Sequence, residues 1–576
     1  MDKLKSIRFS QYNILFSLLI YVLIAVLITA YFSSIVSFYN PVKPITITEG
    51  VLQPKTNISA NSIFNPDPLL TFTDDDQVIE IRKKIASLIF SSLFVEEAPD
   101  KVVGDIVKSY TFENSSNLNL VLYDNIFWHD GERLTAQDVE FTFSLIQNIG
   151  QRSLYYGALN SNNFKIDIVD DFKLNITLLD SAGSNRNEVY IHELTFPILP
   201  KHILSNNYSR NTLLNLSESD FAKSPIGSGP LKYVVNRGGE VEFSRFSEYF
   251  KGPIRFDKYI IRFYRDIESV LYDYRLKNID LFMRHDIGEI DKGAKMLIDG
   301  GMLFENRIIL NQRFAIYFNL ASKANDTSKF NKSTLIRRGL LNVINRNSII
   351  SNMDSSREVL GPIDQDSPFF SQEVMDRLAY NPSAFTTLVE SLGYKKNEEG
   401  FYTKDNVLLQ FDLTYLQVGS SRIIASNIEE QLKQVGVKVN LKPYNNQNTQ
   451  NDTFSDIVRN RNYDVLLIAI SHSQDPDIYS EWHSSQTNPP GLNLSGFSSR
   501  VADKYIEDGR TTSGNERIQA YTRFQRTFFE ESPAIYLVNP SMQIFSSSIL
   551  SIPKSEKMVD TYYIYHDINN WSINVD

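Results

Sequence analysis

Polar and aromatic side chains follow a strand-length apolar run that extends from Tyr463 to Ile470. Asp475, Tyr479, Trp482 and Asn493 supply a carboxylate, two aromatic rings and an amide within a short stretch beyond that run. Such groups bind a solute by hydrogen bonding and stacking, and α/β folds gather ligands at the carboxyl ends of their strands. We therefore predict a ligand site here, although Tyr479 and Trp482 are equally compatible with core packing.

Residues for covalent catalysis show no recognisable spacing. The sequence contains no H-E-x-x-H, G-x-S-x-G or Walker motif. Its seven histidines are scattered, at His129, His192, His202, His285, His472, His483 and His566. We predict a protein that is not an enzyme, while a secreted hydrolase whose acids meet only in the fold stays open as an alternative.

The composition also disfavours metal and nucleic acid. There is no cysteine, which excludes disulfides, thiolate metal ligands and a lipidated N-terminus. Asp74, Asp75 and Asp76 precede a helical pattern, where acids favour the positive end of a helix, and a metal site is the less favoured interpretation. The formal net charge of -10 provides no broad basic field for phosphates. We expect no cofactor, no metal and no nucleic-acid partner.

The residues around the predicted site alternate between strand and helix patterns. With 576 residues the chain exceeds what one core organises, because a domain holds roughly 150 residues. Leu408 to Leu416 is predicted to be a strand, and the helical pattern that follows ends at Gly436. Apolar residues alternate from Val437 to Leu441, which predicts the next strand. The run from Tyr463 to Ile470 fits a central strand covered on both faces. These patterns predict an α/β lobe with a cleft at its strand ends.

The first half of the chain shows further local signals. Ile45 to Glu49 alternates like an edge strand, and Ile81 to Ile89 has helical spacing. The Thr135 hydroxyl is predicted to cap the backbone N–H of Asp138 at the start of a helix. The two glycines in Ser224 to Pro230 fit neither phosphate-binding spacing, so a structural turn is expected there.

The N-terminus contains an apolar stretch without charge from Ile14 to Phe38. It is long enough to cross a hydrocarbon layer of roughly 30 Å as a helix. Lys3, Lys5 and Arg8 precede it, so the positive-inside rule keeps the short N-terminus in the cytoplasm. We predict a retained single-pass anchor in the cell membrane with the body outside, and a cleaved signal peptide is the competing interpretation.

Several segments together resemble the family 5 extracellular solute-binding proteins, the oligopeptide-, dipeptide- and nickel-binding components of ATP-driven importers. Phe127 to Thr142 resembles the family pattern W-x-D-G-x-x-L-T-A-x-D-V. Pro225 to Pro230 is similar to its P-x-G-S/T-G-P turn, and Ile336 to Arg346 resembles its helix V-R-x-A-L-x-x-A-I-D-R, from which Gly339 and Asn345 depart.

The resemblance implies an α/β, two-lobed, periplasmic-binding-protein-like fold of type II with an extra subdomain, here preceded by one N-terminal transmembrane helix. Ligand binds between lobes that close about a hinge. The expected organisation is a cytoplasmic N-terminus (1–13), the transmembrane helix (14–38), a linker and the start of lobe I (39–70), the extra subdomain (71–195), lobe I (196–315), lobe II (316–495) and a return to lobe I (496–576).

One departure from the family bears on the ligand. In peptide-binding members, an aspartate four residues before a D-P or E-P proline pairs with the ligand's α-ammonium group. Counting back from Pro476, this chain has His472, and a neutral imidazole holds a cation less well than a carboxylate does. Gln474 and Asp475 are predicted to contribute beside it, while a solvent-facing role for His472 remains the alternative.

The partners follow from the same resemblance. We expect a monomer that binds a peptide or other small solute, works with an ABC permease and ATPase, and contacts the membrane through its N-terminal helix. A membrane-tethered sensor or scaffold that uses the same cleft is the alternative from another class. Nickel or a haem-like ligand is disfavoured because no cysteine and no close histidine cluster are present.

Overall fold

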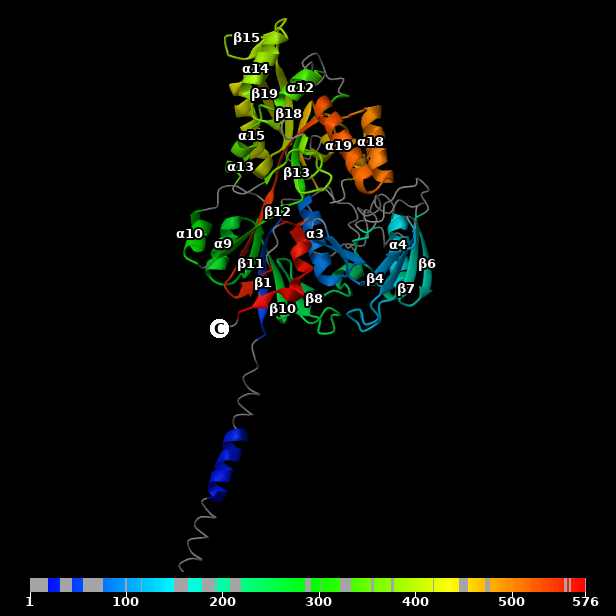
Figure 1. Ribbon diagram of the computed structural model, residues 1–576. Coiled ribbons are helices and arrows are strands. Elements are labelled where there is room, and N and C mark those ends of the chain that lie inside the picture. Colours follow the sequence, from blue (N-terminus) through cyan, green and yellow to red (C-terminus); the bar gives the residue numbers. More distant parts are fainter. Residues whose placement is uncertain are drawn as a thin grey trace, which may run out of the picture. The chain divides into compact units, whose positions relative to one another are not determined.

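Figure 1 shows the computed structural model of the chain. The structure describes residues 19–31, 44–54, 76–98, 101–114, 117–149, 164–178, 191, 194–207, 219–284, 292–301, 303–321, 333–353, 357–373, 378–417, 419–444, 454–471, 477–489, 491–553, 557–558 and 561–574. The chain divides into two compact units, Met1–Thr46 and Ile47–Asp576.

The first unit contains a helix over residues 19–31 whose residues are all exposed. Among the described residues, no helix combines the length and the apolar character needed to cross a membrane. The span predicted for Ile14 to Phe38 is thus described only in its middle part, and the remainder of that prediction lies outside the described residues.

The second unit contains an eight-stranded sheet in the order β24-β12-β22-β11-β1-β10-β9-β8. Its strands are β1 (Thr46–Leu52), β8 (Leu231–Asn236), β9 (Glu240–Arg245), β10 (Lys258–Tyr264), β11 (Leu281–Arg284), β12 (Phe304–Leu310), β22 (Ser541–Ser546) and β24 (Lys557–Met558). The helices α3 (Asp76–Ile89), α8 (Asp220–Lys223), α9 (Ile267–Arg275) and α10 (Lys292–Asp299) accompany this part of the chain. The predicted edge position of the strand at Ile45 to Glu49 is wrong, because β1 lies between β11 and β10 inside the sheet.

A buried charge explains why β1 is held inside. Glu49 is fully buried, and its Oε1 accepts a hydrogen bond from Lys84 Nζ of α3 at 2.7 Å. The hydroxyls of Tyr259 and Tyr565 donate to the same carboxylate at 2.7 and 2.8 Å. Because a buried carboxylate is tolerated only when its oxygens are paired, this cluster joins β1, α3, β10 and the C-terminal segment.

A separate antiparallel sheet, in the order β4-β5-β7-β6, lies within the residues predicted for the extra subdomain. Its strands are β4 (Val107–Phe112), β5 (Asn117–Leu122), β6 (Phe164–Asp170) and β7 (Lys173–Leu178), with the helices α4 (Ala136–Ile149) and α6 (Lys201–Asn207) nearby in sequence. The hairpin of β2 (Phe94–Ala98) and β3 (Lys101–Gly104) precedes β4.

The start of α4 differs in detail from the predicted cap. The Thr135 hydroxyl accepts from the backbone N–H of Gln137 at 3.3 Å, not from that of Asp138. The Asp138 carboxylate instead accepts the backbone N–H of Thr135 at 2.9 Å. It also accepts the backbone N–H of Lys201 at 2.9 Å. The buried Asp138 carboxylate therefore stabilises the start of α4 and the start of α6.

The two motifs at residues 127–142 and 225–230 pack against one another through His129. The backbone N–H of Gly227 donates to His129 Nδ1 at 3.2 Å, and Nε2 lies 3.0 Å from the carbonyl oxygen of Gly229. This places the proton on Nε2. A Cβ at Gly227 would lie 2.0 Å from the carbonyl oxygen of Ile89, which explains glycine at this position. The predicted structural role of the turn is confirmed.

The six-stranded sheet has the order β14-β21-β13-β20-β18-β19. Its strands are β13 (Gln312–Phe318), β14 (Arg357–Glu358), β18 (Gln410–Leu416), β19 (Lys438–Tyr444), β20 (Val465–Ser471) and β21 (Ala534–Asn539). Its helices are α12 (Thr334–Leu340), α13 (Arg346–Ser351), α14 (Pro382–Ser391), α15 (Gly419–Gln434), α16 (Phe454–Arg459), α17 (Tyr479–Trp482), α18 (Arg500–Thr511) and α19 (Gly514–Glu531). The parallel pair β18 and β19, joined by α15, confirms the predicted strand-helix-strand unit. The interior position of β20 confirms the predicted central strand.

Smaller elements complete the described fold. These are the sheet of β15 (Lys395–Lys396), β16 (Tyr402–Lys404) and β17 (Val407–Leu408), the pair β23 (Leu550–Ser551) and β25 (Ser572–Ile573), and the 3-10 helices η6 (Ser484–Gln486), η7 (Thr561–Tyr565) and η8 (Ile568–Asn570).

The segment from α18 to β21 belongs with the six-stranded sheet, whereas sequence analysis ended lobe II at residue 495. Two buried arginines of the 336–346 motif hold it there. Arg337 donates to the carbonyl oxygens of Glu531 and Ser532, at 2.7 and 3.0 Å, where α19 ends. Arg346 donates to the carbonyl oxygen of Tyr536 in β21 at 2.9 Å. The chain enters the eight-stranded sheet again only at β22.

Two chain segments pass side by side between the large sheets. β12 continues into β13 through Asn311, and β21 continues into β22 through Pro540. The backbone N–H of Leu310 donates to the carbonyl oxygen of Pro540 at 2.9 Å, and Asn539 Nδ2 donates to the carbonyl oxygen of Gln312 at 2.7 Å. The two crossings therefore form one paired connection (Figure 1).

The environment of His129 makes stability depend on pH. Desolvation lowers the pKa of His129 from 6.5 to about 4 in the folded protein. As the pH falls from about 6.5 toward 4, the unfolded chain takes up this proton first, so the free energy of unfolding should fall by up to about 3 kcal/mol. Above pH 6.5 this contribution is fully present.

The variant His129→Gln should flatten the dependence, because its amide cannot be protonated. Urea unfolding of wild type and variant at pH 7 and pH 5 measures the difference. His566, whose pKa is also lowered to about 4 by desolvation, contributes in the same window, so the double variant should be flatter still. An unchanged slope in His129→Gln would contradict the assignment.

Candidate functional site

The predicted site follows the carboxyl end of β20. Ser471, the last residue of this strand, pairs with Gln312, the first residue of β13 and a neighbour of the paired crossing. His472, Gln474 and Asp475 lie outside the described residues. Three of the six predicted ligand residues therefore fall on a segment that connects β20 to α17.

The chain beyond this segment is tied to α18. The Asp477 carboxylate accepts the backbone N–H of Tyr479 at 3.2 Å and forms an ion pair with Arg510, whose Nε lies 3.1 Å from Oδ2. The Arg510 guanidinium also lies 4.2 Å from the centre of the Tyr479 ring. A cation over an aromatic face stabilises by about 0.5–2 kcal/mol. Arg510 therefore fixes the start of α17 through two contacts, with the Asp477 carboxylate and with the Tyr479 ring.

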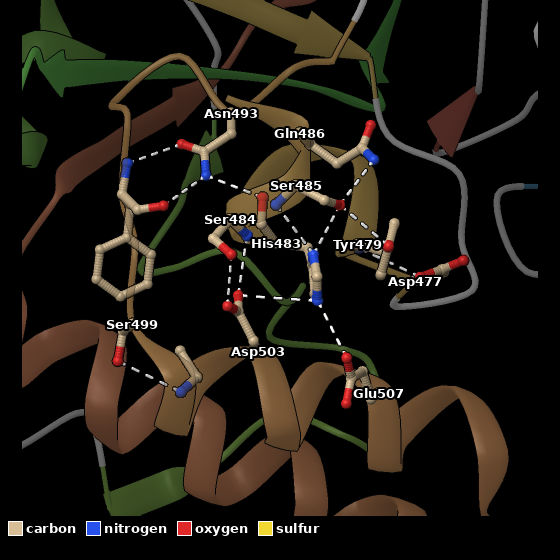
Figure 2. Close-up of polar contacts among 12 residues, drawn as sticks. Asp477, Tyr479, His483, Ser484, Ser485, Gln486, Asn493, Ser499, Asp503 and Glu507 are labelled. Atoms are coloured by element: carbon tan, nitrogen blue, oxygen red, sulfur yellow. Dashed lines mark hydrogen bonds and ion pairs between the residues drawn. The ribbon is translucent and has the colours of Figure 1, made fainter. Parts of the chain in front are cut away.

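His483 is the centre of the polar network in Figure 2. Its ring stacks on Tyr479 with centroids 4.2 Å apart and planes inclined by 20°. Its Nδ1 accepts the backbone N–H of Ser485 at 3.2 Å and lies 2.8 Å from the Ser485 hydroxyl. Since Nδ1 is the acceptor, the proton of the neutral ring lies on Nε2, which faces Glu507 Oε1 at 3.3 Å.

Two carboxylates one turn apart on α18, those of Asp503 and Glu507, contact this loop. Asp503 accepts the backbone N–H of Ser484 at 2.8 Å and its hydroxyl at 2.6 Å. Glu507 faces His483 and keeps a side chain that is 55% exposed. One carboxylate is therefore engaged by the loop backbone, while the other remains open to solvent on one side (Figure 2).

Asn493 has all the polar atoms of its side chain engaged within the protein. It is fully buried, and its Nδ2 donates to the carbonyl oxygens of His483 and Phe497 at 3.1 and 2.8 Å. Its Oδ1 accepts the backbone N–H of Phe497 at 3.0 Å. The amide thus bridges two turns of the loop, and its predicted contact with ligand stays untested.

Trp482 lies in the core of the six-stranded sheet. It is fully buried, it stacks on Tyr317 with centroids 5.8 Å apart, and its Nε1 donates to the Tyr536 hydroxyl at 3.3 Å. Burial raises the pKa of Tyr317 and of Tyr536, so both phenols remain protonated. The packing interpretation of Trp482 accounts for every contact named here.

Tyr479 is the predicted ligand residue with the most accessible position among those described. It is partly buried, and its hydroxyl lies 3.1 Å from the Ser485 hydroxyl. Because His483 and Arg510 contact its ring, stacking by a further group is restricted, and the hydroxyl edge is the part left for a solute. Its contact with ligand remains a prediction.

Sequence reasoning missed His483, Asp503 and Glu507 as members of one network. Asp503 and Glu507 are four residues apart, a spacing that places two side chains on one face of a helix. That signal was available, but their partners lie about twenty positions earlier in a loop, and no periodicity relates a loop to a helix.

The Ser485, His483 and Glu507 side chains include the atom types of a nucleophile, a base and an acid. The geometry favours a different role, because the backbone N–H of Ser485 already occupies the Nδ1 lone pair. The Ser485 hydroxyl is also contacted by Tyr479 and by Gln486 Nε2 at 3.1 Å. The arrangement therefore acts as a rigid hydrogen-bonded support for the loop beside β20.

Two large sheets joined by a paired crossing, with a supported loop at the carboxyl edge of one of them, define a two-lobed α/β binding protein. Residues 101–490 match the bacterial extracellular solute-binding proteins, family 5, middle part. The chain belongs to this family, which confirms the resemblance seen in the sequence.

Relatives agree with this assignment. The oligopeptide-binding protein AppA of Bacillus subtilis (strain 168) is 26% identical over 514 residues, covering 83% of this chain and 88% of its own. Its structure with a nonapeptide has a TM-score of 0.66 at 22% identity, covering 92% of this chain and all of that one. NikZ of Campylobacter jejuni, solved with Ni(L-His), has a TM-score of 0.69 at 21% identity and also covers 92% of this chain and all of its own. The structural likeness establishes the fold.

Replacing Asn493 tests whether its role is structural. Asn493→Ala leaves three buried backbone groups without their partner, so the free energy of unfolding without ligand should fall by about 2–3 kcal/mol. Asn493→Asp keeps the acceptor but sets a carboxylate against two carbonyl oxygens, and should cost at least as much. Chemical denaturation measures both, with Ser513→Ala, at an exposed N-cap whose side chain makes no capping hydrogen bond, as the control. Unchanged stability with lost ligand affinity would favour the ligand role instead.

Proposed function

We propose that this protein captures a peptide or peptide-like solute outside the cell by closure of two lobes and delivers it to an ABC permease and ATPase. Family membership supports the capture of a solute. The paired crossing supports the proposed closure, because Asn311 and Pro540 connect strands that belong to different sheets. A bend at these positions reorients the lobes without opening either core.

Separate cores support this motion. The buried cluster around the six-stranded sheet draws its residues from Phe314 to Val538. Another cluster, around α9 and β11, includes Tyr264, Phe282 and Phe545 of the eight-stranded sheet. A ligand that contacts both lobes only in the closed state shifts the equilibrium by its differential affinity, so no chemical step is required.

The ligand class rests on relatives. AppA of Bacillus subtilis is described with a nonapeptide, and DppA of Helicobacter pylori with the peptide STSA. NikZ is described with Ni(L-His), in which an amino acid is part of the ligand. We propose a peptide-like solute for this chain, and the ligand contacts predicted at His472, Gln474, Asp475 and Tyr479 belong to this proposal.

A ligand screen tests capture directly. Peptide pools and cell extracts are added to the purified protein, and melting is followed while mass spectrometry identifies what co-purifies. A ligand at 100 times its Kd should raise the free energy of unfolding by about 2.7 kcal/mol. No shift with any pool would count against capture, and pool peptides that are cleaved on incubation would favour the hydrolase alternative.

His472→Asp tests the predicted ammonium position. A carboxylate pairs with an ammonium group more strongly than a neutral imidazole does, so affinity for peptides with a free N-terminus should rise about tenfold. N-acetylated peptides serve as the control and should bind the variant and the wild type equally. If peptides with a free N-terminus also bind the variant and the wild type equally, residue 472 does not contact the ligand.

We also propose that the N-terminal apolar stretch tethers the protein to the cell membrane. The helix over residues 19–31 exposes large apolar side chains, including Tyr21 at 74% and Leu23 at 60%. Such a surface favours a hydrocarbon environment. The full chain should stay with membranes after alkaline extraction, whereas a chain starting at Pro44 should be released. Release of both proteins from the membranes would contradict the proposed tether.

The sensor or scaffold alternative differs in its partner. Mild cross-linking in cells followed by affinity purification should recover a permease and an ATPase if the protein serves uptake. Recovery of a signalling partner in their place would favour the alternative.

A further inference from the structure

The carboxyl ends of β1 and β11 meet at one edge of the eight-stranded sheet (Figure 1). These strands are parallel neighbours, with Glu49 beside Leu281 and Gly50 beside Phe282. After β11 the chain continues through α10 to β12 on one side, whereas the next strand of this sheet after β1 is β8, at the other side. In open α/β sheets, ligands bind where neighbouring connections diverge in this way.

A row of side chains crosses the sheet at this edge. Because side chains alternate along a strand, Leu52 at the end of β1 and Arg284 at the end of β11 lie on one face. Gln543 of β22 is paired with Arg284, and Arg307 of β12 is paired with Gln543. Side chains paired across antiparallel strands have Cβ atoms about 4.5–5.5 Å apart, so the two arginines are the neighbours of Gln543 on this face.

The helix cover over this face ends before the row. Deeper in the sheet, Phe282 packs against Tyr274 of α9 in a buried cluster. In the row itself, Leu52 is 42% exposed and Arg284 is only partly buried, whereas Gln543 is fully buried. The row therefore opens to solvent at Leu52 and ends inside the protein at Gln543.

Gln543 has a hydrogen-bond acceptor that the protein does not use. Its Nε2 donates to Glu305 Oε1 at 2.8 Å, and because a carboxylate only accepts, this contact fixes the orientation of the amide. The amide Oε1 is buried and has no hydrogen-bond partner among the described residues. The Ser541 hydroxyl, two residues earlier on the same face, is also buried and has no partner there. Buried polar atoms are ordinarily hydrogen-bonded, so these two atoms indicate a place for a group from outside the chain.

The same row carries an excess of positive charge. Arg307 Nε donates to Glu305, the carboxylate that also holds the Gln543 amide. The Arg284 guanidinium forms no ion pair in the part of the chain that the structure describes. One carboxylate therefore serves the two arginines, and Arg284 is the cation left for a ligand.

We propose that Arg284 and Gln543 bind the C-terminal residue of the captured peptide. The guanidinium pairs with the terminal carboxylate, and Gln543 Oε1 accepts the backbone N–H of the same residue. In a peptide these two groups are attached to one Cα, so a single residue supplies the acceptor for Arg284 and the donor for Gln543. The Ser541 hydroxyl is a further donor for the carboxylate. This inference rests on the proposed function and specifies its substrate class, a peptide with a free C-terminus.

Chemically altered peptides test the two contacts separately. Each peptide recovered in the ligand screen is prepared as the free acid, as the C-terminal amide, and as the free acid with a methyl group on its last peptide nitrogen. Calorimetry with the full-length protein should show the free acid binding at least about tenfold more tightly than either altered form, because each alteration removes one hydrogen-bonded contact. Equal affinity for the free acid and the amide would overturn the carboxylate contact and leave capture intact. Failure of every peptide in every form would count against the proposed function itself.

Arg284→Gln locates the carboxylate contact. The variant removes the cation and keeps a polar side chain, so affinity for the free acid should fall at least about tenfold while affinity for the amide changes little. Arg275→Gln, which removes an exposed arginine from the last turn of α9, is the matched control and should bind like the wild type. An Arg284→Gln protein that retains the wild-type preference for the free acid would overturn the assignment.

Gln543→Leu locates the N–H contact. Leucine has no acceptor, so this variant should bind the methylated and unmethylated acids equally, whereas the wild type distinguishes them. The melting temperature without ligand shows whether the variant folds, and Gln543→Met, with an unbranched side chain, replaces it if it does not. A folded variant that still discriminates against the methyl group as the wild type does would assign the unused oxygen to a bound water and overturn its contact with the ligand.

Discussion

The paired crossing is the constraint on which the two-sheet body depends. Each large sheet contains strands from distant parts of the chain, and the two segments that pass between them do so side by side. Because Leu310 and Pro540 are hydrogen-bonded to one another, neither segment bends alone. The strands on the two sides of the crossing contribute to separate buried clusters, and this is why closure is proposed to bend the chain at Asn311 and Pro540.

Buried cations hold the discontinuous lobes together. Arg337 and Arg346 donate to carbonyl oxygens of the segment from Glu531 to Tyr536, and Lys84 of α3 pairs with Glu49 of β1 in the eight-stranded sheet. Desolvation lowers the pKa of both arginines to about 10, which leaves them charged at neutral pH. The arginines of the motif at residues 336–346 therefore serve the assembly of this part of the fold.

The loop that includes His483 and Asn493 is held in place by hydrogen bonds. His483, Asp503 and Asn493 hydrogen-bond to the loop backbone, and the predicted ligand residues His472 and Asp475 precede them in the sequence. A hydrogen-bonded support of this kind fixes the backbone that it contacts.

The sequence by itself determined the local elements and the family. The stripe that ends at Gly436, the apolar run of β20 and the motif around Trp128 depend on neighbouring residues, whose periodicity and turn chemistry can be read along the chain. Only the tertiary structure decided which distant segments meet: that β1 is an interior strand, that α18 to β21 belong with the six-stranded sheet, and that Asn493 bridges the loop backbone. The physical reason is that burial and hydrogen-bond partners are set by contacts far apart in the sequence, such as Glu49 with Tyr565, and no local pattern encodes them.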